Sequence, residues 1–240
     1  MGNKTSVFTT FGGGFGDCWA TASFFATEGK TKEVFLETVD PRILKIIAQF
    51  DTSIPQIIYT RQPADVAIMS PSDSTYFFSQ RGYQPKFIVP WRTMFARPYL
   101  PTRVTWRQQQ CRKRIVYHLS PSTFGPTSCQ PGEAELLVEK LTYLKFEAIR
   151  LGDHMSLEEN IKIAASSDFF IGIDSGVSHL CHSVGIPIVL IRNRLTSNYL
   201  KVTHAKKAYV EVESIPCFLN NFHKILGQIE TYTELQMPCR

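Results

Sequence analysis

The sequence predicts an α/β protein made of two Rossmann-like halves, each built on a parallel β-sheet. Short β-rich runs alternate with helical patterns between Ser6 and Met69, which is typical of parallel strands joined by helices. The alternation restarts at Arg114 and continues to Ile191. The chain has 240 residues, 43% of them apolar, which is enough for two small domains that each bury a core.

In the first half, a glycine cluster at 12–16 ends the first strand. Asp40-Pro41 starts the second helix because proline suits the first helical position, and apolar residues follow it at helical spacing. The expected order is strand, helix, strand, helix, strand and strand, over residues 6–11, 18–27, 33–39, 40–50, 54–59 and 65–69.

Residues 70–110 are rich in proline and aromatic residues, are weakly periodic, and are expected to lead into the second half. There the expected strands and helices alternate, starting with a strand, over residues 114–119, 133–143, 146–151, 156–166, 169–173, 177–184 and 188–191. An apolar stripe from Phe218 to Ile229 predicts a final helix.

Composition excludes several classes of protein. No apolar run approaches the roughly 18–20 residues of a membrane helix, and residues 1–6 lack the apolar segment of a secretory signal. The six cysteines form no C-x-x-C pair and no metal-ligand spacing. In a chain of this length they are expected to be reduced thiols of a cytoplasmic protein.

The net charge of +5 arises from one stretch of the chain. Residues 74–132 contain no carboxylate and carry nine Lys or Arg side chains, with Tyr, Phe and Trp interleaved among them. Basic and aromatic side chains together suit a polyanion with flat groups, such as a nucleic acid. The structural alternative is a solvated basic face whose aromatic side chains pack inward.

The strand–glycine–helix junction at 12–17 is the first candidate site. Glycines allow the backbone to approach a ligand closely, and a helix N-terminus favours negative charge. The glycines fit neither a dinucleotide fingerprint nor a P-loop. Asp17 places a carboxylate at this junction. The alternative interpretation is that Asp17 only stabilises the first turn of the helix, which is worth about 0.3–1 kcal/mol.

The second candidate is the turn from Ile173 to His179, where a hydrophobic strand ends and a helix begins. Ligands of open α/β sheets bind at the carboxyl ends of strands. The amides of Ser175 and Gly176 could face an anion, with Asp174 and His179 beside it. The alternative is an Asp N-cap with a packed histidine. A third candidate is the loop after His118, whose hydroxyls suit phosphate oxygens but also occur in ordinary loops.

At this point the sequence resembles a known family. Ser156-Leu-Glu-Glu, followed by the run from Ile163 to Leu190 with its Asp-Ser-Gly-Val-Ser-His core, is similar to the donor-site segment of heptosyltransferase-like glycosyltransferases of family 9. Gly16-Asp17 resembles the Gly-Asp pair after that family's first strand. The resemblance implies a GT-B architecture, with two Rossmann-like domains facing a cleft.

The resemblance also implies boundaries and roles. The domains would be an acceptor-side domain over 1–105, a nucleotide-sugar domain over 106–215, and a helix and tail over 216–240 that pack back on the first domain. Asp17 would be the catalytic base, in a glycine loop of Gly13, Gly14 and Gly16. The residues that would hold the donor are Ser120, Ser122, Thr123, Asp153, Asp174, Ser175, Gly176 and His179.

Two departures from the family pattern are visible. The lysine that usually follows the hydroxyl loop is missing, and Arg192 is the expected substitute, with Arg194 as the alternative. The chain is also shorter than is usual in the family, chiefly in its acceptor half. The expected reaction uses a UDP- or ADP-sugar and needs neither a cofactor nor a metal, because there is no D-x-D motif or His/Cys cluster. It is expected to invert the sugar's stereochemistry in a single displacement.

The basic stretch directs the choice of acceptor. We expect a hydroxymethylated base in DNA, which is similar to the substrate class of phage DNA glucosyltransferases and would place the enzyme in a host cytoplasm. The free-energy cost of flipping such a base out of the duplex could be recovered through its contacts with aromatic side chains. The expected acceptor-binding residues are Arg81, Lys86, Trp91, Arg92 and Arg97.

Three alternatives stay open at this point. One is a heptosyltransferase-like enzyme that acts on a phosphorylated lipopolysaccharide core. Another is a Rossmann-type nucleic-acid methyltransferase that uses Gly12–Gly16, with Glu37 as its ribose acid. The third is a nucleic-acid-binding module that keeps a degenerate sugar-nucleotide fold.

Overall fold

The chain forms two compact units, Met1–Arg103 and Val104–Arg240. The computed structural model describes residues 6–10, 14–28, 34–38, 42–50, 57–59, 66–69, 87–90, 99–106, 113–119, 129, 132–191 and 209–236, and gives the strands of the first unit by their backbone. Each unit contains a five-stranded sheet in which the neighbouring strands run parallel. The predicted α/β class with parallel sheets is confirmed.

The sheet of the first unit has the strand order β3-β2-β1-β4-β5. Its strands are β1 (Ser6–Thr10), β2 (Val34–Thr38), β3 (Ile57–Tyr59), β4 (Val66–Met69) and β5 (Phe87–Pro90). Two helices pack on each other, α1 (Phe15–Glu28) and α2 (Arg42–Ile47). Trp19 of α1 is fully buried and meets the ring of Phe50 edge-on, with the ring centroids 5.6 Å apart.

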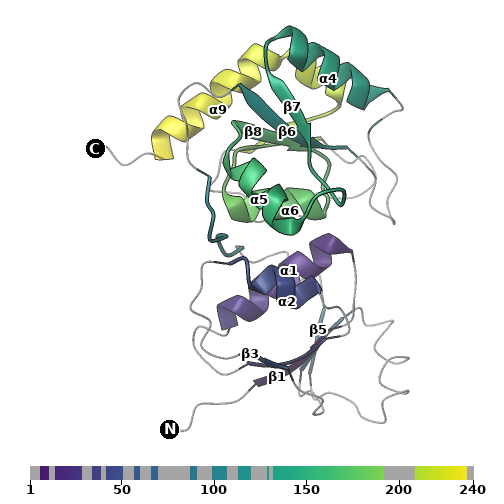
Figure 1. The fold of residues 1–240 in the computed structure, drawn as a ribbon, viewed down its shortest axis with the longest axis vertical. Coiled ribbons are helices and arrows are strands. Elements are labelled where there is room, and N and C mark those ends of the chain that lie inside the picture. The colour runs from purple at the N-terminus through teal and green to yellow at the C-terminus, as the bar shows by residue number, and fades with distance from the viewer. Residues whose placement is uncertain are drawn as a thin grey trace. The chain divides into compact units, whose positions relative to one another are not determined.

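The sheet of the second unit has the order β10-β9-β8-β6-β7. Its strands are β6 (Arg114–His118), β7 (Glu147–Arg150), β8 (Phe169–Gly172), β9 (Ile188–Ile191) and β10 (Tyr209–Val212). Its helices are α4 (Glu133–Tyr143), α5 (Leu157–Ala165), α6 (Gly176–Val184), α8 (Ile215–Asn220) and α9 (Phe222–Gln236). In this unit α4 and α9 cover one face of the sheet, and α5 and α6 cover the other (Figure 1).

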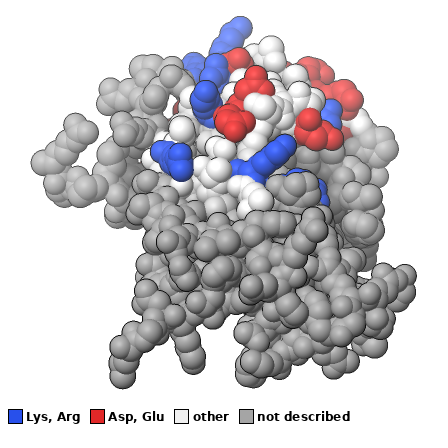
Figure 2. All heavy atoms as spheres, turned by 60° about the horizontal axis from the view of Figure 1, so that its bottom comes forward, with Lys and Arg blue, Asp and Glu red and all other residues white. Residues whose placement is uncertain are grey.

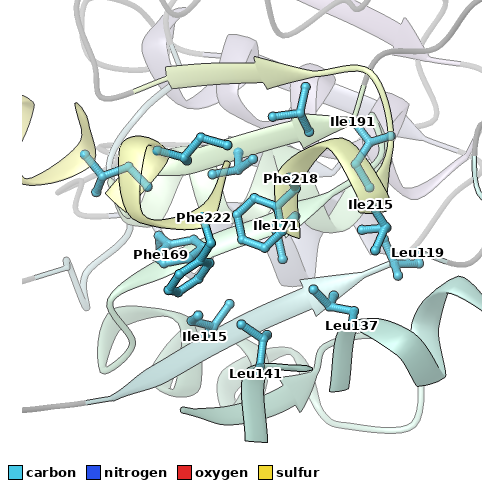
Figure 3. Packing of buried hydrophobic residues seen from close by; sticks show 14 of the residues in the cluster. Ile115, Leu119, Leu137, Leu141, Phe169, Ile171, Ile191, Ile215, Phe218 and Phe222 are labelled. Atoms are coloured by element: carbon cyan, nitrogen blue, oxygen red, sulfur yellow. The ribbon is translucent and has the colours of Figure 1, made fainter. Parts of the chain in front are cut away.

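The core of the second unit explains why β8 and β9 are continuous hydrophobic runs. All four residues of each strand are buried, because helices cover both faces of the sheet. Phe218 of α8 and Phe222 of α9 meet edge-on at 5.5 Å between ring centroids, and both pack against strand residues such as Phe169 (Figure 3). The described part of the segment 216–240 therefore packs on the second unit. Its expected contact with the first unit stays a prediction.

Two observed strands were not among the expected elements, β5 and β10. Both lie at an edge of their sheet. Both are only four residues long, Phe-Ile-Val-Pro and Tyr-Val-Glu-Val, so their apolar, β-branched pattern is too short to stand out from the sequence around it. Phe87–Pro90 lies within the proline-rich stretch 70–110, which hid its strand character.

The close approach of β6 and β8 gives a stability prediction. A Cβ added at Gly172 would clash with the carbonyl oxygen of His118 and would lie 2.5 Å from Phe170 Cζ. We expect Gly172→Ala to lower the free energy of unfolding by about 1–3 kcal/mol or more, because the strands would have to separate. Urea unfolding measures this change.

The matched control is Gly227→Ala in α9, where an added Cβ would meet nothing within 4 Å. This substitution should stabilise the protein by about 0.5–1 kcal/mol, since alanine is the better helix former. Equal effects of the two substitutions would contradict the close strand contact.

Candidate functional site

Three strand ends of the second unit form the framework of the candidate site. Because β6, β7 and β8 are parallel, their carboxyl ends meet at one edge of the sheet. β6 lies between the other two strands, with His118 paired to Gly172 and Tyr117 paired to Arg150. The turns that follow β7 and β8 therefore lie on either side of His118.

The turn after β8 leads directly into α6. Ser175 is the N-cap, in an extended backbone conformation (φ −150°). Its amide donates to Ser178 Oγ (2.9 Å), and the Ser178 hydroxyl donates to the Ser175 carbonyl (2.6 Å). This reciprocal pair fixes the first turn of α6, whose amides form the positive end of the helix dipole.

Asp174 and His179 form a buried pair in the same turn. His179 Nε2 lies 3.4 Å from Asp174 Oδ1, and the two side chains are 5% and 10% exposed, respectively. His179 is fixed one helical turn into α6, where its amide donates to the Ser175 carbonyl (3.2 Å). The expected grouping of Asp174, Ser175, Gly176 and His179 is thus present in the structure, with the carboxylate held at the helix start.

The turn after β7 is fixed by Asn160 of α5. The Asn160 side chain accepts from the amide of Gly152 (2.9 Å) and donates to the carbonyls of Gly152 (2.9 Å) and Ser156 (2.9 Å). The predicted capping box of Ser156 and Glu159 is confirmed, since each side chain accepts from the other residue's amide. These bonds hold Asp153, a predicted donor residue, at the same sheet edge as Asp174.

His118 was not predicted as a site residue, yet the structure places it at the centre of this edge. Its Nδ1 lies 3.1 Å from Ser175 Oγ, a hydrogen bond whose donor depends on the ring tautomer. Burial lowers the pKa of His118 to about 4; Arg150 and His154 add to this effect, and Asp153 opposes it. At neutral pH the imidazole is therefore uncharged.

Asp17 lies in the first turn of α1, in the other unit. Its Oδ2 accepts a hydrogen bond from the amide of Gly14 (2.7 Å). Burial raises the pKa of Asp17, and this effect outweighs the opposing effects of the Gly14 bond and of Arg42. A carboxylate with a raised pKa is a better proton acceptor than an exposed one, so its environment suits the base predicted from the sequence.

Part of the predicted set lies outside the described residues. These residues are Gly13, Arg81, Lys86, Trp91, Arg92, Arg97, Ser120, Ser122, Thr123, Arg192 and Arg194. Gly14 and Gly16 are described, and they flank the amino end of α1.

Four described members of the basic and aromatic stretch serve the packing of their own unit, namely Tyr99, Arg103, Trp106 and Arg114. Arg103 Nε donates to the Phe50 carbonyl (3.2 Å), and Arg114 Nε pairs with Glu147 Oε2 (2.7 Å). Trp106 Nε1 donates to the Ser167 carbonyl (2.8 Å), and Tyr99 is buried. On the face shown in Figure 2, the described Lys and Arg side chains lie among Asp and Glu side chains. At these positions the structural interpretation of the stretch fits better than an acceptor surface.

No three His, Cys, Asp or Glu side chains in the described ranges gather as ligands for a metal ion. Among the helices of this part of the chain, none is both long and apolar enough to cross a membrane.

Part of the second unit matches a known protein family. Residues 125–200 match the family model of glycosyltransferase family 9 (heptosyltransferase). The matched segment includes Asp153 and the whole turn from Asp174 to His179. The resemblance to family 9 predicted from the sequence is confirmed. The comparison with curated protein sequences found no match.

Solved structures extend the likeness to both units. *E. coli* ADP-heptose lipopolysaccharide heptosyltransferase II has a TM-score of 0.64 at 10% identity, over 94% of this chain and 99% of that chain. *E. coli* heptosyltransferase WaaC with ADP has a TM-score of 0.57 at 11% identity, over 94% and 100%. TibC of enterotoxigenic *E. coli*, an iron-containing heptosyltransferase in complex with ADP-D-beta-D-heptose, has a TM-score of 0.54 at 12% identity, over 92% and 76%. At these identities the likeness shows the fold, and it confirms the expected GT-B class.

The lowered pKa of His118 gives a prediction that needs no ligand. Between pH 6.5, its ordinary pKa, and about pH 4, the unfolded chain binds a proton at this histidine that the folded chain does not. The free energy of unfolding should therefore fall as the pH is lowered through this window, by up to about 1.4 kcal/mol per pH unit. Urea unfolding of wild type and His118→Asn at several pH values isolates this contribution. Equal pH dependence in both proteins would refute the burial of a neutral His118.

Proposed function

We propose that the protein is a glycosyltransferase that moves a sugar from a nucleoside diphosphate sugar to a hydroxyl group of a saccharide acceptor, in the manner of a heptosyltransferase. The observation that carries the proposal is the turn from Asp174 to His179, which is fixed at a strand end and lies inside the family 9 match. An ADP-sugar is the first donor to test, because the relatives of known structure include one with ADP and one with ADP-D-beta-D-heptose.

The chemistry of the donor follows from this turn. A nucleoside diphosphate gains negative charge as the bond to the sugar breaks, and amides that already point at it stabilise that charge without reorganisation. The first turn of α6 supplies such amides, and its first residue, Gly176, has no side chain that could block close approach. The buried Asp174 is fixed by His179, so its carboxylate is in position to accept hydrogen bonds from sugar hydroxyls.

Asp17 is the base in this proposal. The acceptor oxygen forms a bond to the anomeric carbon while the bond from that carbon to the phosphate oxygen breaks. Asp17 takes the proton of the acceptor hydroxyl, and the nucleoside diphosphate leaves with the electron pair of the broken bond. A single displacement of this kind inverts the anomeric configuration. Within the described ranges, Cys18, Cys129, Cys181 and Cys217 form no disulfide, and this fits a cytoplasmic enzyme, as does the chemistry of the donor.

The comparisons favour a saccharide acceptor over the hydroxymethylated DNA base expected from the basic stretch, because three of the solved structures with a similar fold are heptosyltransferases. The contacts of Arg103, Trp106 and Arg114 also favour a saccharide acceptor, because these side chains bind other residues of the protein. DNA as the acceptor stays a prediction that rests on residues outside the described ranges. A methyltransferase that uses Glu37 leaves the turn from Asp174 to His179 without a role.

The donor prediction uses ligand-induced stabilisation. Among ADP-, UDP-, GDP- and CMP-sugars, we expect the ADP-sugars to raise the melting temperature most. A ligand that binds only the folded protein raises the free energy of unfolding by about 2.7 kcal/mol when its concentration is 100 times its Kd. Asp174→Asn should reduce this shift. Glu147→Gln also replaces a carboxylate by an amide, but at the amino end of β7, and it should leave the shift in melting temperature unchanged. A chain that responds to S-adenosylmethionine and to none of these sugars would contradict the proposal.

The acceptor prediction compares two polyanions. A truncated, phosphorylated lipopolysaccharide core should accept the sugar, whereas duplex DNA with hydroxymethylated bases should accept none. Binding to DNA that weakens steeply between about 50 and 200 mM salt, together with sugar transfer to it, would instead support the DNA acceptor.

The Asp17 prediction separates catalysis from helix stabilisation. Asp17→Asn should lower turnover by about 10²–10⁴-fold, the usual value of a general base, and should retain donor binding. Since burial raises the pKa of Asp17, ionisation at neutral pH opposes folding, so the free energy of unfolding should stay equal or rise. In the wild type, the rate should fall at acidic pH as Asp17 becomes protonated, with an apparent pKa above that of an exposed aspartate.

Glu135→Gln is the matched control, an exposed carboxylate in the first turn of α4. It should leave turnover unchanged and lower stability by about 0.3–1 kcal/mol at most. If Asp17→Asn behaves like this control, Asp17 is a helix stabiliser and has no part in the reaction.

A further inference from the structure

We propose that His118 is a positioning residue of the donor site, which holds the turn from Ile173 to Ser175 in place so that the first turn of α6 is ready to receive the diphosphate. The inference rests on the proposed function, because it assigns a task to a residue beside the proposed donor turn. His118 lies at the carboxyl end of β6, outside the residues that sequence analysis selected.

His118 holds this turn at two points. Its backbone carbonyl accepts a hydrogen bond from the amide of Ile173 (3.2 Å), and its ring Nδ1 lies 3.1 Å from Ser175 Oγ. Asp174 lies between these two anchored residues. One residue of β6 therefore fixes the backbone on one side of Asp174 and a side chain on the other.

The ring of His118 is itself held from the opposite side. A Cβ added at Gly152 would lie 3.6 Å from His118 Cδ2, so the glycine backbone is close to the ring edge. Asn160 fixes this glycine through both its amide and its carbonyl. The imidazole is thus confined between two turns, each of which is tied to its own helix, and this limits its rotation.

The charge state of the ring supports this task. Burial keeps His118 neutral at pH 7, with Arg150, Asp153 and His154 as the charged or titratable groups around it. A neutral imidazole keeps one acceptor and one donor nitrogen, so it forms the bond to the Ser175 hydroxyl without placing a further charge beside Asp174. Preorganisation of this kind improves binding because less freedom is lost when the ligand arrives.

The test uses two substitutions of equal shape. Asn and Leu have the same branched outline, but Asn places a polar atom near the position of Nδ1 and Leu does not. We expect His118→Leu to weaken the binding of ADP about fivefold to tenfold, the value of one hydrogen bond. His118→Asn should bind ADP within about twofold of wild type. Isothermal titration with ADP, repeated with UDP, measures these affinities, and circular dichroism verifies the fold of each variant.

A double-mutant cycle with Ser175→Ala separates positioning from general stability. If His118 acts through Ser175, the double variant His118→Leu/Ser175→Ala should bind ADP no more weakly than Ser175→Ala. A merely structural histidine would lower the melting temperature and leave the affinity of the folded protein unchanged. Losses of affinity that multiply in the double variant, or His118→Leu with wild-type affinity, would overturn the inference while the proposed function stands. A wild-type protein that binds none of ADP, UDP, GDP and CMP would instead refute the proposed function, and this task of His118 with it.

Discussion

The contact between β6 and β8 at the His118–Gly172 pair is the constraint on which the site depends. The strands approach so closely there that a Cβ on Gly172 would clash with the His118 carbonyl oxygen. Only a residue without a side chain allows this approach. The next residue, Ile173, then donates to the same carbonyl, and Asp174 and Ser175 follow directly. The site is therefore assembled by sheet pairing rather than by the loop alone, which gives it the rigidity of the core.

That core also explains why polar groups gather where they do. β8 and β9 are buried along their whole length, and α4, α8 and α9 fill the space on one face of the sheet with Leu, Ile and Phe side chains. Polar side chains inside such a sheet would lose their hydration. At the carboxyl ends of the strands, the turns and the helix starts supply hydrogen-bond partners. Asp174 illustrates this, since its burial is compensated by His179.

The sequence predicts the elements that carry strong local patterns. The strands at 114–119 and 169–173 were predictable because their apolar runs end at loop residues, and the turn from Asp174 to His179 followed from the same pattern. His118 and Asn160 were not predictable, since their importance comes from their partners. Ser175 lies 57 positions from His118 in the sequence, and Gly152 lies eight positions before Asn160, outside its helix. Nor could the raised pKa of Asp17 be predicted, because it depends on burial by tertiary packing rather than on its place in a helical turn.

The two helices that begin at the candidate residues use their N-termini in opposite ways. α1 has an acidic residue in its first turn, Asp17, whose carboxylate accepts from an amide at the helix start. The first turn of α6 contains no acidic residue, and its N-cap serine is bonded to His118. The dipole of α1 is thus compensated within its first turn. At α6 the nearby carboxylate, Asp174, precedes the N-cap and pairs with His179, so in the proposed function the first-turn amides of α6 act on the bound anion. The proposed reaction, which moves a proton to a carboxylate and negative charge to a departing diphosphate, would use both arrangements. This chain provides one in each unit.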